Sequence, residues 1–164
     1  MLAVLLHAPV APAGRIGSGP GPGVIFGVDG GYSLGFDPGP NTRGAWGFGA
    51  RAGYSFRGGV AIDARYDDLG VRGAGAPLQV ASGGARYTLP MIVMPFVEAR
   101  VGAEIDPAGA YFAAAPALGL ELPVARHASI EFTARDWLAD RAGGLESVLT
   151  LQLGVTVRLG HGGH

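Results

Sequence analysis

Apolar and polar residues alternate along most of this chain. In the stretch VAIDARYDDLG, residues 60–70, Asp63, Arg65 and Asp67 take every second position, and apolar residues fill the positions between them. Alternate side chains of a β-strand point to opposite faces, so this stretch predicts a strand with one charged and one apolar face. A soluble barrel would turn the charged face outward to water, whereas a barrel in a lipid bilayer would turn it inward.

Eight segments with this two-residue period follow one another from Val24 onward. Each is bounded by Gly, Pro, Asp or Asn, which are residues typical of turns. No segment has a sustained helical period. We therefore predict one all-β domain over residues 24–160, an eight-stranded antiparallel up-and-down transmembrane β-barrel with a polar lumen filled by side chains. The predicted strands are 24–36, 46–56, 60–70, 78–88, 95–106, 110–122, 127–137 and 147–159.

Residues outside this region read as flanking segments. The start, MLAVLLHAPVAPAG, joins a short apolar run to Ala11-Pro12-Ala13, an A-x-A pattern typical of signal-peptidase sites. Residues 1–23 are predicted to be a partial signal peptide and a Gly/Pro linker, and the alternative is an ordinary disordered N-terminus. Residues 161–164 are predicted to be a flexible tail.

Composition narrows the classes of function. Only 15% of residues are charged and the net charge is −1, which argues against nucleic acid as a partner. All 12 basic residues are Arg, which suits bidentate pairing with carboxylates away from bulk water. The absence of Cys excludes a disulfide framework and a thiolate metal site. The 30 Gly and 12 Pro suit strands joined by tight turns and suit helices poorly.

Glycines and charges on the polar face favour an inward orientation. Small residues make room for Arg and Glu inside a narrow barrel of about eight strands. Acids and bases on this face nearly cancel, seven against six, and a buried lumen requires such pairing because an unpaired buried charge is costly. The glycines are Gly27, Gly31, Gly35, Gly47, Gly49, Gly53, Gly102, Gly119 and Gly154. The predicted lumen charge network, a structural one, consists of Asp29, Arg51, Asp63, Arg65, Asp67, Arg86, Glu98, Arg100, Glu104, Glu121, Glu131, Arg135 and Arg158.

Aromatic residues on the apolar face cluster near the predicted strand ends. Two such girdles are typical of barrels that face lipid. Phe96 and Trp137 are exceptions, because their positions do not follow the alternation that places the other aromatic residues on the apolar face. The connections at one end, DPGPNTR, GVRGAGAP and LADRAGGLE, are predicted to be longer loops than most of those at the other end. One girdle comprises Phe36, Trp46, Tyr66 and Phe112, and the other comprises Phe26, Tyr54, Phe56 and Tyr87.

The stretch GGARYTLPMIVMPFVEARVGAE, residues 83–104, resembles a recurring hairpin of small outer-membrane β-barrels of the OmpA-type transmembrane domain family. The resemblance extends over about residues 24–159. It implies a bacterial outer-membrane protein that contacts membrane lipid, is inserted by the outer-membrane assembly machinery, and carries no catalytic signature. Members of these families usually end their last strand on an aromatic residue, whereas the predicted last strand here ends at Leu159.

These observations predict an integral outer-membrane barrel with a structural or surface-interaction role and no large pore. We expect a monomer that needs no cofactor. The alternative is a secreted, soluble, lipocalin-like barrel, apolar inside, that binds an apolar ligand. A weaker alternative is an outer-membrane hydrolase acting on lipid A, because His127, Ser129 and Glu131 share one strand face and include a base, a nucleophile and a carboxylate.

Metal chemistry finds little support in the sequence. His161 and His164 lie on a Gly-rich tail, which makes a poor metal site. Asp67 and Asp68 are adjacent in a predicted strand, so their side chains point to opposite faces and cannot hold one cation together. No catalytic, cofactor-binding or metal-binding residue is predicted.

Overall fold

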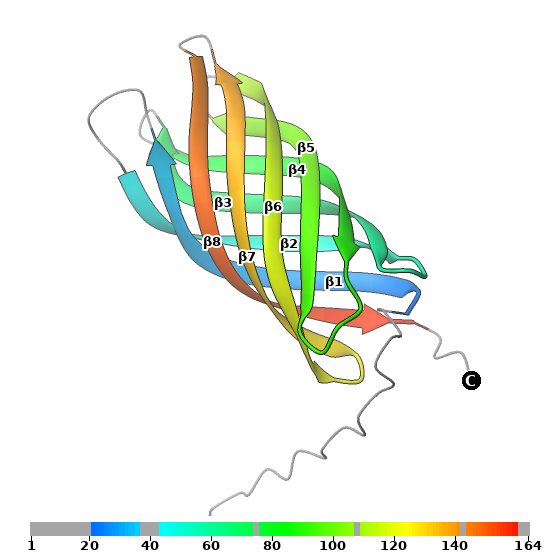
Figure 1. Cartoon of the computed structure of the whole chain (residues 1–164). Helices are drawn as coiled ribbons and strands as arrows, with labels where there is room; N and C mark the ends of the chain where they lie inside the picture. Colours follow the sequence, from blue (N-terminus) through cyan, green and yellow to red (C-terminus); the bar gives the residue numbers. More distant parts are fainter. Residues whose placement is uncertain (1–20, 37–42, 74–75, 107–108, 142–143, 161–164) are drawn as a thin grey trace, which may run out of the picture.

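The computed structural model describes residues 21–36, 43–73, 76–106, 109–141 and 144–160, which form eight antiparallel strands in one closed barrel (Figure 1). This architecture confirms the predicted fold class. Among the described residues, no helix is long and apolar enough to cross a membrane. The strands are β1 (Gly23–Phe36), β2 (Arg43–Ser55), β3 (Val60–Gly73), β4 (Ala76–Thr88), β5 (Met94–Asp106), β6 (Gly109–Ala125), β7 (Ala128–Arg141) and β8 (Gly144–Leu159).

Closure of the barrel depends on the pairing of its first and last strands. β1 pairs with β8 from Val24 opposite Leu159 to Phe36 opposite Ser147, and every other strand pairs with its sequence neighbours. Each backbone N–H and C=O of the wall can therefore find a partner within the sheet, which a bilayer requires because its core offers no water.

Several connections are shorter than predicted, because the strands are longer. β3 continues to Gly73 and β4 begins at Ala76, so most of the predicted loop GVRGAGAP lies within these strands, with Arg72 paired to Pro77 and Gly73 to Ala76. Most of LADRAGGLE likewise belongs to β7 and β8. The prediction of long loops at these two places is wrong, because Gly and Pro that signal turns in a sequence also pair within a sheet. DPGPNTR lies mostly outside the described residues.

A register shift between Asp68 and Arg72 explains how β3 and β4 remain paired beyond the predicted strand ends. Gly70 lies in the shifted segment with φ +66, and its N–H donates to Asp68 Oδ1 over 2.9 Å. A Cβ at this position would lie 1.9 Å from the carbonyl oxygen of Trp46. Glycine is therefore required here by both the backbone angle and the close approach of β2.

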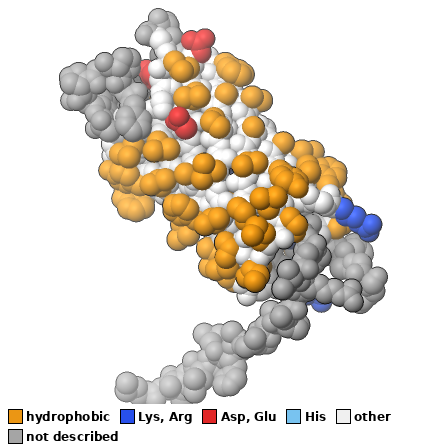
Figure 2. Space-filling model, in the orientation of Figure 1, with side chains coloured by type: hydrophobic (Ala, Val, Ile, Leu, Met, Phe, Trp, Pro, Cys, Tyr) orange, Lys and Arg blue, Asp and Glu red, His pale blue; other side chains and the backbone are white. Residues whose placement is uncertain are grey.

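The two faces of the barrel wall differ in polarity. Apolar side chains cover most of the face seen in Figure 2, and large exterior residues such as Leu118 and Leu153 are 66% and 62% exposed. An apolar patch of this extent marks a surface that contacts other apolar material, here membrane lipid. The predicted charged residues are inside, so the alternative of a soluble barrel with an apolar interior is wrong.

The interior itself has two zones. Ion pairs occupy the middle and the lower end of the interior, and we call this region the charged zone. The lower end is the end at which the β2–β3, β4–β5 and β6–β7 connections lie. Toward the upper end lies a cluster of buried apolar residues, which we call the apolar layer. Its members come from the upper parts of five strands: Leu69, Leu78, Val80, Ala113, Ala115, Trp137, Ala139 and Val148.

Candidate functional site

Glu98 on β5 is the centre of the charged interior. Its Oε1 accepts hydrogen bonds from Arg135 Nη2 at 2.8 Å and Arg100 Nη1 at 3.1 Å. Its Oε2 accepts from Arg86 Nε and Nη2 at 3.2 and 3.1 Å, and Arg51 Nη1 lies 3.9 Å away. The carboxylate is completely buried, and its four arginines come from β2, β4, β5 and β7. One negative charge thus joins four strands of the wall.

Two further carboxylates extend the network toward the lower end. Glu131 on β7 accepts hydrogen bonds from Arg51, and from Arg86 at 2.9 and 3.1 Å. Glu121 on β6 pairs with Arg158 on β8, whose Nη2 lies 2.7 Å from Oε2. Arg158 is the most exposed of these arginines, which places the lower border of the network near the strand ends.

Arg65 on β3 organises the upper part of the network. Its Nε and Nη2 donate to both oxygens of Asp67 over 2.7–2.9 Å, and Nη2 also reaches Asp29 on β1 at 2.5 Å. Gln152 on β8 donates to Asp67 at 3.2 Å, and Arg135 Nη1 lies 3.8 Å from the same carboxylate. The upper part is therefore connected through Arg135 to the central Glu98 cluster.

The structure places every residue of the predicted lumen network on the inner face. Asp63 pairs with Arg100 across β3 and β5, and Glu104 on β5 is buried at 1% exposure. Acids and arginines from all eight strands take part, so each strand is held to others besides its hydrogen-bonded neighbours. Removing one partner of a buried ion pair typically costs about 3–5 kcal/mol, because the other charge is left uncompensated.

Glycine makes room for these guanidinium groups. A Cβ at Gly49 would lie 2.2 Å from Arg65 Nη2, and a Cβ at Gly27 would lie 2.7 Å from Arg51 Nε. The remaining space lined by Gly27, Arg51 and Glu131 has a volume of about 10 Å³. This space is too small for more than about one water molecule, so side chains fill the lumen at this level.

Aromatic residues lie on both faces of the wall. Phe26, Trp46, Tyr54, Phe56, Tyr66, Tyr87 and Phe112 of the predicted girdles are on the exterior, and the side chain of Phe36 lies outside the described residues. Phe96 and Trp137, whose parity differs, are in the interior and are 3% and 0% exposed. The guanidinium of Arg86 lies 3.8 Å from the ring centre of Phe96, so this ring belongs to the charged zone.

Neither candidate chemistry is assembled as a site. Ser129 Oγ donates to Glu121 Oε1 at 2.7 Å, whereas His127 lies in the exposed β6–β7 turn. Asp67 faces the interior, and Asp68 on the exterior accepts the Gly70 N–H, as their adjacent positions require. The described residues contain no group of three or more His, Asp or Glu that could hold a metal ion, and the histidines of the C-terminal tail lie outside them.

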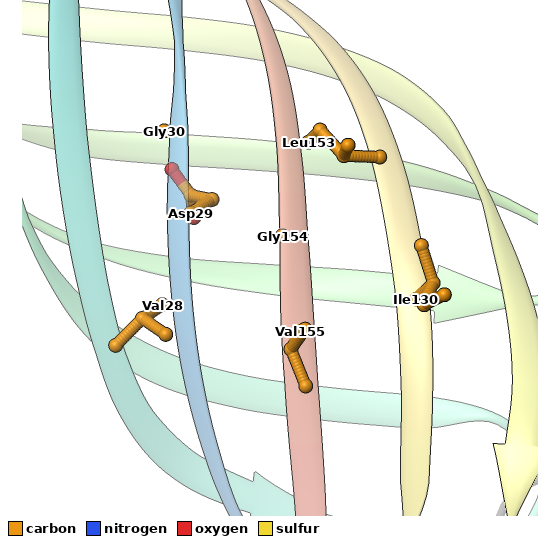
Figure 3. Close-up of a pocket in the computed structure, with 7 residues that line it drawn as sticks. All are labelled: Val28, Asp29, Gly30, Ile130, Leu153, Gly154 and Val155. Carbon is orange, nitrogen blue, oxygen red and sulfur yellow. The ribbon is translucent and has the colours of Figure 1, made fainter. Parts of the chain in front are cut away.

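A shallow groove crosses the exterior where β7, β8 and β1 adjoin (Figure 3). Gly30 on β1 pairs in register with Leu153 on β8 and with Phe48 on β2, and because it has no side chain it helps to form the groove. Val28, Ile130 and Val155 line the remaining sides. The groove is thus an unevenness in an apolar wall that faces lipid.

Solved structures of similar fold are small outer-membrane barrels. The neisserial surface protein NspA matches with a TM-score of 0.72 at 15% identity, over 85% of this chain and 100% of that one. The N-terminal β-barrel domain of Pseudomonas aeruginosa OprF matches with a TM-score of 0.58 at 14% identity, over 82% and 97%. The attachment invasion locus protein Ail of Yersinia pestis matches with a TM-score of 0.56 at 13% identity, over 84% and 99%. No protein-family profile and no curated protein sequence matches the chain.

These matches show that the chain has the fold of the small eight-stranded outer-membrane β-barrels, the group that the hairpin at residues 83–104 resembles. The apolar exterior gives an independent physical reason for a membrane location. The predicted bacterial outer-membrane location agrees with both observations.

Proposed function

We propose that this protein is an integral outer-membrane barrel whose role is structural or one of surface interaction, without a large pore and without catalysis. The observation that carries the proposal is the filled interior, in which Glu98 and its four arginines cross the lumen. Solutes of the size that porins admit find no path through such a lumen.

The comparisons support the general kind of protein. NspA and Ail are described as a surface protein and an attachment protein, so barrels of this fold serve at the cell surface. The partners we propose are membrane lipid around the apolar exterior and the assembly machinery that inserts such barrels. We propose a monomer, because one chain closes the whole sheet and leaves no strand edge to pair with another chain.

Two measurements on refolded protein test this proposal. An SDS gel of boiled and unboiled samples should show a faster unboiled band only after refolding in detergent. Liposomes that contain the folded barrel should not swell in isotonic sugar solution. A monomeric protein that refolds without detergent would contradict the membrane location, and sugar-driven swelling would contradict the absence of a large pore.

The hydrolase alternative gains no support from the geometry. Ser129 is 1% exposed and its hydroxyl donates to Glu121, and Glu131 is held by two arginines. A serine nucleophile needs a base within hydrogen-bond reach and access to substrate. The buried Ser129 has no access to substrate, and Glu121, the carboxylate that its hydroxyl contacts, is already paired with Arg158 and Arg86.

A further inference from the structure

The apolar layer has no counterpart in the charged zone beneath it. Trp137 on β7 is completely buried and packs among Leu69, Val80 and Ala115 in the interior of the barrel. These side chains offer no hydrogen-bond acceptor, and the indole N–H of Trp137 accordingly finds none among the described protein atoms. Five of the eight strands thus contribute hydrocarbon to the lumen near the upper end, while β1 and β5 contribute the buried polar side chains of Ser33 and Glu104.

Trp137 lies at the junction of the two zones. The guanidinium of Arg135, two residues earlier on the same inner face, is 5.8 Å from the centre of the indole ring. Arg135 in turn pairs with Glu98, so the apolar layer begins where the ion-pair network ends. Glu104 on β5 pairs in register with Val80 and borders the layer from that side.

The two zones differ in how they would oppose a moving ion. Charged side chains that line a lumen can exchange partners and pass a hydrated ion along, which is why rings of charge serve as filters in channels. An apolar constriction gives an ion nothing to replace its water, and such constrictions close pores by excluding water. Moving a bare ion into hydrocarbon costs many kcal/mol.

We propose that the apolar layer, rather than the ion-pair network, is the barrier that closes this barrel to ions, and that Trp137 is the side chain that seals it. The inference rests on the proposed function in one respect, the absence of a large pore. Beyond that function, the inference identifies the residues that prevent ion conduction and gives the apolar layer and the ion-pair network different roles.

The primary test is the conductance of refolded protein in planar lipid bilayers. The wild type should show no stable current steps, and Trp137→Ala should show steps that the wild type lacks. Trp46→Ala is a matched control, because it makes the same change at a residue that is 77% exposed on the exterior, and it should remain closed. Glu98→Gln, which weakens the network but leaves the layer intact, should also remain closed.

The conductance results that would contradict the proposed function differ from those that would overturn the inference about the apolar layer. A wild type that already conducts as an open pore would contradict the proposed function itself. A closed wild type with a closed Trp137→Ala barrel, shown to be folded by its gel mobility, would overturn the inference and leave the proposed function standing. A conducting Glu98→Gln barrel would also overturn it, because the network would then be the barrier.

A second measurement leaves Trp137 in place, so it does not depend on the folding of a Trp137 variant. The sequence contains two Trp, so Trp46→Phe leaves Trp137 as the only indole. In the folded barrel its fluorescence should be blue-shifted and resistant to quenching by aqueous iodide, and it should become quenchable after unfolding. Ready quenching of the folded barrel would show that water and ions reach the layer, which would overturn the proposal.

Discussion

The charged zone and the apolar layer occupy the same inner face of the same strands, yet they achieve order in different ways. In the charged zone each side chain is fixed by its partners, as Glu98 is by four arginines. In the apolar layer each side chain is fixed by the space that its neighbours leave, and the large Trp137 shares one buried cluster with the small Ala115 and with Leu69. The comparison shows that one barrel interior can be specified both by charge pairing and by volume.

The largest expected effect is that of Glu98→Ala, which removes the centre of the charged zone. We expect the free energy of unfolding in lipid vesicles to fall by about 3–5 kcal/mol, because four arginines lose their shared partner. Glu98→Gln should lose less, since it retains the size and an acceptor oxygen. Urea titration followed by Trp fluorescence would measure both changes.

Asp140→Ala is the matched control for that loss of charge, because Asp140 is an exposed exterior carboxylate on β7. Its effect should stay within about 0.5 kcal/mol. If Glu98→Ala were as mild as Asp140→Ala, the ion pairs would contribute no specific stability and the first half of the comparison would fail.

Leu69→Ala should have a smaller but clear effect on the apolar layer. Leu69 is 1% exposed, and truncating a buried Leu leaves a cavity that typically costs about 2–5 kcal/mol, of which we expect the lower part. The same urea titration would measure it. Leu69→Ile, which conserves volume, should cost less than about 1.5 kcal/mol. Equal losses from both variants would mean that volume does not specify this zone.

Among the alanine substitutions in the interior, the smallest effect is expected for Ser129→Ala at the lower end of the charged zone. It removes one hydrogen bond to Glu121, which should lower the free energy of unfolding by about 1 kcal/mol. Lipid A acylation in cells that carry the variant should be the same as with the wild-type protein. A changed acylation pattern would revive the hydrolase alternative that the geometry does not support.

The alternation of residue types predicts the barrel and sorts the residues into two faces, and the glycines and nearly balanced charges of the polar face indicate that this face is the inner one. A one-residue slip moves every side chain to the other face, so the parity of Asp63, Arg65 and Asp67 determined which residues share the lumen. It could not determine partners across the lumen. The meeting of Arg51 with Glu131, 80 residues apart, depends on how the strands are staggered around the closed barrel.

Two features went unrecognised for physical reasons. In the sequence, Trp137 and Phe96 stand out only as departures from the exterior aromatic pattern, although their parity places them on the inner face with the charged residues. The predicted strands at β3 and β4 are shorter than the observed ones, because Gly and Pro weaken a strand in isolation and so indicate a turn. The register shift that keeps these residues paired contains Gly70, where β2 approaches so closely that a side chain would not fit.

The pairing of β1 with β8 has a consequence for the time course of biosynthesis. Val24 meets Leu159 only after the last strand has been synthesised, so neither edge of the sheet can be completed before then. Contacts so distant in sequence form slowly, and until they form an apolar wall and two open strand edges are exposed to water. The newly made chain must therefore be shielded from aggregation for the whole interval before insertion, and loss of β8 alone would leave it permanently in that vulnerable state.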